Sequence, residues 1–229
     1  AGLAQTAIQG VVNSLSGMTD EVMNTSDAIE KFQSTMNFAG KTKEETEEAT
    51  KLFKKYADDT VYDLNDITNT GAQLAANGIE SYKELAIAAG NLNAVAGGNA
   101  DTFKSVGMVL TQTAGAGKLT TENWNQMADA IPGASGKMQE ALKNMNAYTG
   151  DFRDAMADGQ ISAEEFLKAI QDLGSTDAAE EAARSTKTFE GAIGNLEATV
   201  TTGMTNVLDA FGKEKVTGTI TKFGDIVAK

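Results

Sequence analysis

Apolar side chains recur at helical spacing through the middle of the chain. Between residues 41 and 174 they form short stripes of period three to four, each closed by glycine or by Pro132-Gly133. This pattern is typical of amphipathic helices that bury one face against one another. The core is expected to be built from the large apolar residues of these stripes, namely Leu52, Phe53, Leu85, Leu92, Phe103, Val106, Leu110, Trp124, Phe166 and Ile170.

Three Ser/Thr-x-x-Glu sequences mark predicted helix starts. In such a capping box the hydroxyl and the carboxylate satisfy amide groups that the start of a helix leaves free. The three are Thr42-x-x-Glu45, Ser81-x-x-Glu84 and Ser162-x-x-Glu165. We further expect Asp101 to cap the helix that carries Phe103, and Gly115 to end it.

The two ends of the chain have a different pattern. Residues 1–15 carry an apolar stripe whose other face is uncharged, and the first charged residue is Asp20. From Phe189 to Phe211 apolar residues repeat at alternating steps of three and four, which predicts one long amphipathic helix. Packing against other helices is the favoured interpretation of this stripe, and contact with a membrane is the alternative.

These patterns predict an all-α protein, a compact multi-helix domain flanked by extended amphipathic helices. The expected division is N-terminal amphipathic helices at 1–40, the compact domain at 41–174 and long amphipathic helices at 175–229. The chain begins with Ala1 and stops within an apolar pattern. We therefore expect a segment of a longer protein, without a secretory signal.

Composition supports a helical, acidic protein and excludes several chemistries. Of 229 residues one is Pro and none is Cys or His, and 19 Lys and Arg stand against 32 Asp and Glu, a formal charge of −13. Without Cys and His there is no disulfide, thiol nucleophile or common zinc site. The acidic balance argues against binding to nucleic acid, which requires clustered cations.

Two glycine- or acid-rich sequences resemble binding sites only superficially. Gly115-Ala116-Gly117-Lys118 lacks the earlier glycine of a phosphate loop and is followed by Leu119 instead of Ser or Thr, so we interpret it as a turn between helices. The acidic residues Glu44, Glu45, Glu47 and Glu48 fit a solvated first helical turn better than a metal cluster.

Residues 154–166 match part of a calcium-binding EF-hand loop. The candidate ligands are Asp154, Asp158, Gln160, Ser162 and Glu165, but Met156 occupies a position that should supply an oxygen. The alternative is a helix that ends near Asp158-Gly159, followed by a helix capped by Ser162. We favour the alternative, and the sequence predicts no metal, no other cofactor and no catalytic residue.

An ordered set of short motifs resembles the N-terminal domain of tailed-phage tape measure proteins over roughly residues 20–175. The motifs are Ala57-Asp58-Asp59-Thr60-Val61-Tyr62, Leu74-Ala75-Ala76-Asn77-Gly78, Gln112, Gly117-Lys118-Leu119, Asn125-Gln126, Ile131-Pro132-Gly133 and Gly159-Gln160-Ile161-Ser162-Ala163-Glu164-Glu165-Phe166. The resemblance implies a non-enzymatic structural protein of a phage or prophage tail, which fixes tail length during assembly and assists genome ejection.

The resemblance also implies partners and a location. The expected partners are the tail tube protein, tail assembly chaperones, distal tail or baseplate proteins and further copies of the chain, with host membrane contact as an open alternative. The expected location is the lumen of the virion tail, and the host cytoplasm during assembly. Two other functions stay open: a calcium-binding helical module, and a segment of a carboxylate-based cell-wall hydrolase.

Overall fold

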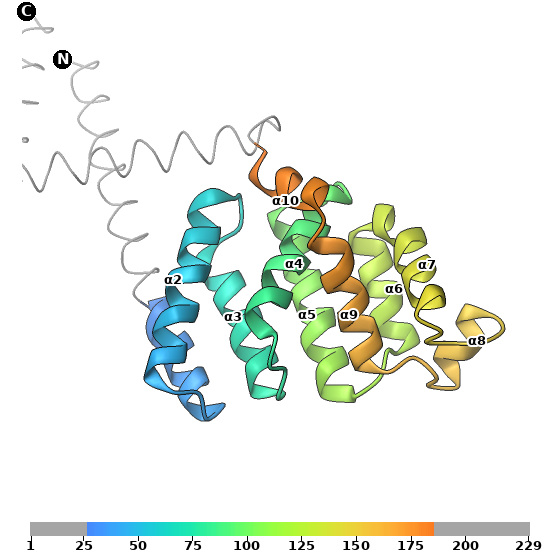
Figure 1. Cartoon of the computed structure of the whole chain (residues 1–229), viewed down its shortest axis with the longest axis horizontal. Helices are drawn as coiled ribbons and strands as arrows, with labels where there is room; N and C mark the ends of the chain where they lie inside the picture. The colour runs from blue at the N-terminus through green and yellow to red at the C-terminus, as the bar shows by residue number, and fades with distance from the viewer. Residues whose placement is uncertain (1–26, 186–229) are drawn as a thin grey trace, which may run out of the picture.

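Helices make up the regular structure of residues 27–185, the part of the chain that this computed structural model describes (Figure 1). A helical segment at 27–38 comes first. It is followed by α2 (Lys43–Asp59), α3 (Leu64–Ala76), α4 (Tyr82–Val95), α5 (Ala100–Ala116), α6 (Thr121–Ala130), a 3-10 turn (Pro132–Ala134), α7 (Ser135–Asn144), α8 (Phe152–Ala157), α9 (Ala163–Gly174) and α10 (Asp177–Arg184). The described part is all-α, as predicted, whereas the stripes at 1–15 and Phe189–Phe211 lie outside it.

The helix α4 lies at the centre of the packing. It contacts α2, α3, α5, α9 and α10. Most of its side chains are buried, and from Leu85 to its end it carries no charged residue. A helix that is apolar on all sides requires neighbours on all sides. The positions of the surrounding helices therefore follow from the need to cover α4.

Two of these neighbours, α3 and α5, contact one another and run in the same direction. Lys104 near the start of α5 lies 3.8 Å from Asp66 near the start of α3. In the middle, a Cβ on Gly107 would lie 2.5 Å from the Thr70 hydroxyl, so the two backbones approach closely. Two helices that run in the same direction need a connection that returns the chain to the starting end, and α4 is that connection between α3 and α5.

On another side of α4, α9 approaches the α4 backbone directly. A Cβ built on Gly174 would overlap the Ala88 carbonyl group, and the Asn91 side-chain amide donates to the Gly174 carbonyl at 3.0 Å. Only glycine permits so close an approach of two backbones. The end of α9 is thereby fixed against the middle of α4.

The predicted core is confirmed with one exception. Phe53, Leu85, Leu92, Phe103, Val106, Leu110, Trp124, Phe166 and Ile170 are all buried. The prediction was wrong for Leu52, which is 36% exposed. The buried stripe of α2 runs through Ala49, Phe53 and Tyr56, and Leu52 lies at its edge because α2 has neighbours on one side only.

Two of the three predicted capping boxes are confirmed, at Thr42 with Glu45 and at Ser162 with Glu165. The prediction for Ser81 was wrong, because its side chain makes no cap hydrogen bond. A capping residue needs extended backbone geometry, and Ser81 has a ψ of 27°. The chain is already turning into α4 at this residue.

The predicted ends of α5 are both displaced by two residues. Its cap is Asn99, which accepts a hydrogen bond from the Thr102 amide at 3.0 Å, while the Thr102 hydroxyl accepts from the Asn99 amide at 2.7 Å. Asp101 instead lies in the first turn, 3.5 Å from Lys104. The helix passes through Gly115 and ends at Gly117, whose φ of 73° is left-handed.

Packing extends on both sides of the predicted compact domain. Phe32 and Met36 precede residue 41 and belong to the core, and Ala179 and Ala183 of α10 are buried beyond residue 174. The boundaries at 40 and 174 stay a prediction. No helix within residues 27–185 is both long and apolar enough to cross a membrane.

We expect Trp124→Ala to lower the free energy of unfolding by about 3–5 kcal/mol. The indole is 3% exposed and packs edge-on against Phe152, with ring centroids 4.6 Å apart. Denaturant unfolding followed by circular dichroism measures the loss. The control is Leu52→Ala at the edge of α2, which should cost less than about 1 kcal/mol. Equal losses in the two variants would contradict this assignment of the core.

Candidate functional site

The residues of the EF-hand-like loop 154–166, whose calcium-binding interpretation is not favoured, form two helix ends and the turn between them. Asp154 lies in the first turn of α8, and Asp158 caps its C-terminal end. Gln160 accepts a hydrogen bond from the Thr149 amide at 3.2 Å. Ser162 donates to Glu165 Oε2 from both its amide and its hydroxyl, at 2.9 and 2.8 Å. The preferred interpretation, two helices joined by a turn, is therefore confirmed for the geometry of this loop.

Met156, in the place of a calcium ligand, is a core residue. It is 3% exposed and belongs to the same apolar cluster as Trp124 and Phe152. In an EF-hand, the residue at the position of Met156 supplies an oxygen to the calcium ion. Here that position faces the apolar core instead. Within residues 27–185, no three acidic side chains gather in a way that would hold a metal ion.

The glycine-lysine sequence at 115–118 forms the last residues of α5 and the turn that follows, so the interpretation as a turn holds from Gly117 onward. This turn contacts the EF-hand-like loop. The Leu119 amide donates to the Ile161 carbonyl at 3.0 Å, and the Ala163 amide donates to the Gly117 carbonyl at 3.1 Å. The two loops thus pair as a short antiparallel bridge between Lys118 and Ser162. Their backbone groups satisfy one another rather than facing a ligand.

The acidic first turn of α2 is held by hydrogen bonds and ion pairs. Glu45 accepts from the Thr42 amide at 2.8 Å, and hydrogen bonds from Thr42 lower the pKa of its carboxyl group. Glu48 lies 3.0 Å from Lys83, and Glu47 lies 3.6 Å from Lys43. These contacts fit the solvated helix start that the sequence indicates.

Among the carboxyl groups of residues 27–185, Asp66 is the one whose pKa is raised by its surroundings. Burial is the main cause, and the Lys104 ammonium group acts in the opposite direction. The two side chains form an ion pair at 3.8 Å between α3 and α5. The arrangement joins two helices, and a hydrolase would in addition need a second carboxyl group across a substrate cleft.

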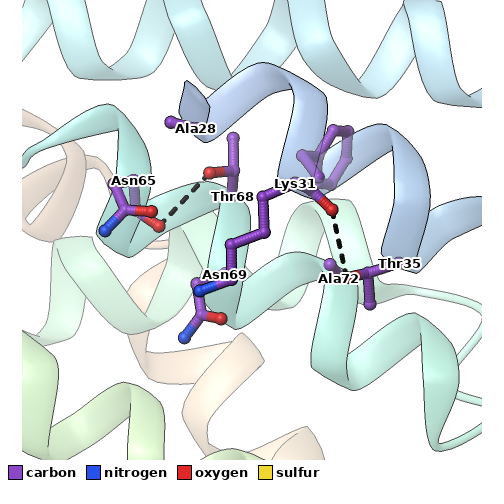
Figure 2. A pocket seen from close by; sticks show the side chains of 8 residues that line it. Ala28, Lys31, Thr35, Asn65, Thr68, Asn69 and Ala72 are labelled. Atoms are coloured by element: carbon purple, nitrogen blue, oxygen red, sulfur yellow. Dashed lines mark hydrogen bonds between the residues drawn. The ribbon is translucent and has the colours of Figure 1, made fainter. Parts of the chain in front are cut away.

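A hollow lies between the helical segment 27–38 and α3 (Figure 2). It is lined by Ala28, Lys31, Phe32, Thr35, Asn65, Thr68, Asn69 and Ala72. The hydroxyls of Thr35 and Thr68 are turned to their own helices, donating to the Lys31 and Asn65 carbonyls at 3.1 and 3.2 Å. Their donors are thus used within each helix, and the hollow is a polar seam between two elements.

A buried polar network joins α2, α4 and α9. The Tyr56 hydroxyl donates to Asn91 Oδ1 at 2.8 Å, and the Asn91 amide donates to the Gly174 carbonyl at 3.0 Å. Burial raises the pKa of the Tyr56 phenol, so this group stays a protonated donor. Asn91 itself is 3% exposed.

The same network continues toward the start of α5. The Tyr62 hydroxyl donates to the Gly90 carbonyl at 2.7 Å and accepts from Asn93 Nδ2 at 2.9 Å. Asn93 also donates to the Asn99 carbonyl at 2.9 Å and accepts from the Thr102 hydroxyl at 2.8 Å. Every polar atom of this fully buried side chain is therefore paired.

Asn91 and Asn93 are not among the residues that the sequence patterns single out. The signal that points to them is their position, because both stand in the uncharged run 85–100. A primary amide within an otherwise apolar helix must find partners when it is buried. Their contacts indicate a structural role, because the two side chains hold the neighbouring helices in position around α4.

Comparisons with known proteins agree on one family. The model of the tape measure protein family matches residues 20–209. A tape measure protein of Lactococcus phage F4-1 is 28% identical over 177 residues, which cover 74% of this chain and 47% of that protein. Probable tape measure proteins of Lactococcus phages p2 and SK1 are each 27% identical over 181 residues, covering 75% of this chain and 18% of theirs. The chain thus spans about half of one relative and about a fifth of the others. No solved structure matches it.

We expect the unmodified protein to show no saturable binding of calcium at micromolar concentrations, because Met156 is part of the core. Calorimetric titration and thermal unfolding with and without calcium measure this. Met156→Asp, which restores the missing ligand type, should lower the melting temperature, since it buries a carboxylate without a partner. A calcium-dependent rise in melting temperature of the unmodified protein would contradict the assignment.

We expect stability to fall as the pH rises from about 10 to about 12. Burial raises the pKa of Tyr62 to about 12 from an ordinary value of 10.0. The unfolded chain therefore releases this proton first, so the stabilisation is complete below pH 10 and is lost toward pH 12. Thermal unfolding at a series of pH values measures the slope, which should be shallower in Tyr62→Phe. Because the pKa of Tyr56 is raised as well, Tyr62→Phe removes only part of the slope, and the same slope in both proteins would show that Tyr62 does not contribute to it.

Proposed function

The chain belongs to the tape measure protein family, and we propose that it is a folded, non-enzymatic segment of such a protein in a phage or prophage tail. The parent protein fixes tail length during tail assembly and assists genome ejection. The observation that carries this proposal is the family match over residues 20–209. Because the chain spans only part of its relatives, the role of the whole protein is part of the proposal.

Within that role we assign residues 27–185 to a compact unit, distinct from the part that measures length. A continuous helix of this many residues would extend for about 240 Å. The longest helices found here have 17 residues, or about 25 Å, and they fold back on one another. A packed unit of this kind adds little length per residue. The division at residues 40 and 174 remains a prediction, because Phe32 and Met36 before it and α10 after it pack with this unit.

The proposed partners are proteins of the tail. They are the tail tube protein, the tail assembly chaperones, the distal tail or baseplate proteins and further copies of the chain. The proposed location is the tail lumen of the virion, and the host cytoplasm while tails assemble. Residues 27–185 contain 25 Asp and Glu against 14 Lys and Arg, which supports a unit that is repelled by the genome rather than bound to it.

The test is a deletion of residues 99–115 in the parent protein, followed by electron microscopy of the tails. The deletion removes α5, which packs against α3, α4, α6 and α9, so the unit should unfold. We expect failed or irregular tails. Deletion of as many residues from a long helical stretch further along the parent protein should give uniformly shorter tails. Uniform shortening by loss of 99–115 would instead make this unit part of the ruler.

Trp124→Ala in the parent protein provides a control that changes no chain length. If the folded unit matters, this variant should also give failed or irregular tails, because it removes a buried side chain. If residue number alone matters, its tails should be normal. Normal tails from a Trp124→Ala protein that is shown to be destabilised would contradict the assignment of residues 27–185.

A further inference from the structure

The end of α3 carries the bond between Asn77 and Gly78. It is the one place in the chain where an asparagine is followed by a glycine. Both residues are exposed, and a Cβ built on Gly78 would meet nothing within 4 Å. Because glycine has no side chain, nothing shields its backbone nitrogen from the side-chain amide of the residue before it. This bond is therefore the most reactive asparagine position in the sequence.

We propose that Asn77-Gly78 is a self-modification site, which is closed in the folded unit and reacts when the end of α3 opens. The Gly78 backbone nitrogen attacks Asn77 Cγ and forms a five-membered imide ring. The Cγ–Nδ2 bond breaks, and Nδ2 leaves as ammonia with the proton from the Gly78 nitrogen. Water then opens one of the two imide C–N bonds, which leaves aspartate or isoaspartate at position 77. The proposal goes beyond the assignment to the tail and does not depend on it.

The fold keeps the two reacting groups apart. With a ψ of 10°, Asn77 places the Gly78 nitrogen on the same side as its own backbone nitrogen, whereas ring closure requires that nitrogen to face Cβ. The Gly78 amide donates to the Ala75 carbonyl at 3.0 Å, and Asn77 Nδ2 donates to the Gln73 carbonyl at 2.8 Å. The attack therefore requires both hydrogen bonds to break and the backbone at Asn77 to rotate.

The turn after α3 can open without unfolding of the whole unit, because helix ends are among the parts of a protein that open most easily. Ile79 is the residue that holds this turn to the core. It is half-buried against the apolar cluster, and its amide donates to the Leu74 carbonyl at 3.1 Å. The reaction in the folded protein is therefore slower than in an open chain by the fraction of molecules in which the turn is open.

The product of the reaction disfavours closure of the turn. A carboxylate at position 77 lacks the donor that Asn77 Nδ2 offers to the Gln73 carbonyl, and it lies at the C-terminal end of α3, where the helix dipole disfavours negative charge. It also lies beside α5, since a Cβ on Gly115 would be 3.2 Å from Asn77 Oδ1. Isoaspartate in addition lengthens the main chain by one carbon within the turn. The reaction thus leaves a permanent chemical mark on a chain whose α3 end has opened.

Peptide mapping by mass spectrometry tests the site. The full chain is incubated at mildly alkaline pH in buffer and in guanidinium chloride, and the conversion of amide to acid is followed in the tryptic peptide 56–83. This peptide also contains Asn65 and Asn69, which are not followed by glycine and serve as internal controls. In denaturant, conversion at Asn77 should exceed conversion at Asn69 by about tenfold or more. In buffer, conversion at Asn77 should be slower than in denaturant by about tenfold or more.

Two variants test the local opening. Ile79→Ala loosens the turn and leaves Asn77 and Gly78 in place, so it should raise conversion in buffer by about threefold or more and leave conversion in denaturant unchanged. The control is Ile87→Ala, the same truncation of a half-buried side chain in the middle of α4. It should leave conversion in buffer within about twofold.

Asn77→Asp tests the effect of the product. Its melting temperature should lie about 2–4 °C below that of the unmodified chain. Asn69→Asp adds the same charge earlier in α3 and can still accept from Gln73, so it should stay within about 1 °C. Conversion at Asn77 that is equal in buffer and denaturant, or no faster than at Asn69 in denaturant, would overturn the proposal. Equal effects of the two isoleucine variants, or equal melting temperatures of the two aspartate variants, would do so as well.

Discussion

The structure depends on one constraint, the burial of most of α4 between Leu85 and Asn93. From Leu85 onward this helix has no charged side chain to turn toward water, so each side of it must be covered. Its small residues let neighbours approach closely: a Cβ on Gly90 would lie 2.5 Å from the Tyr56 hydroxyl oxygen, and Gly174 lies against the Ala88 carbonyl. The surrounding helices are therefore positioned by their contact with α4 as much as by their connections.

Burial of α4 makes its two amides structurally necessary. Asn91 and Asn93 cannot reach water, and an unpaired buried amide costs about 1–3 kcal/mol. Each finds partners from other helices, Asn91 from α2 and α9 and Asn93 from the start of α5. Apolar packing alone tolerates sliding of one helix along another, whereas these hydrogen bonds form at one register. The polar network thus specifies the arrangement that the hydrophobic contacts stabilise.

The sequence predicted the helices and their punctuation because these are local properties. The boxes at Thr42 and Ser162, and the burial of residues such as Phe103, follow from short-range spacing. The prediction that Leu52 is buried was wrong because burial also depends on which helices pack alongside. Leu52 has the right spacing for the core but lies at the edge of an outer helix. Met156 is polarisable and flexible, and nothing local tells whether it faces a loop or the core.

The family motifs mostly mark corners of this fold. Gly117-Lys118-Leu119 pairs with residues 161–163, and a Cβ on Gly133 would lie 2.7 Å from the Ala96 carbonyl oxygen. The shared motifs therefore reflect how the helices are connected and packed.

The burial of α4 also has a consequence for synthesis on the ribosome. About 80 residues separate the end of α4 from the end of α9, which takes about 4–16 s to translate. For those seconds the apolar surface that α9 and α10 will cover is open, so the nascent chain is most vulnerable to aggregation before its last helices emerge.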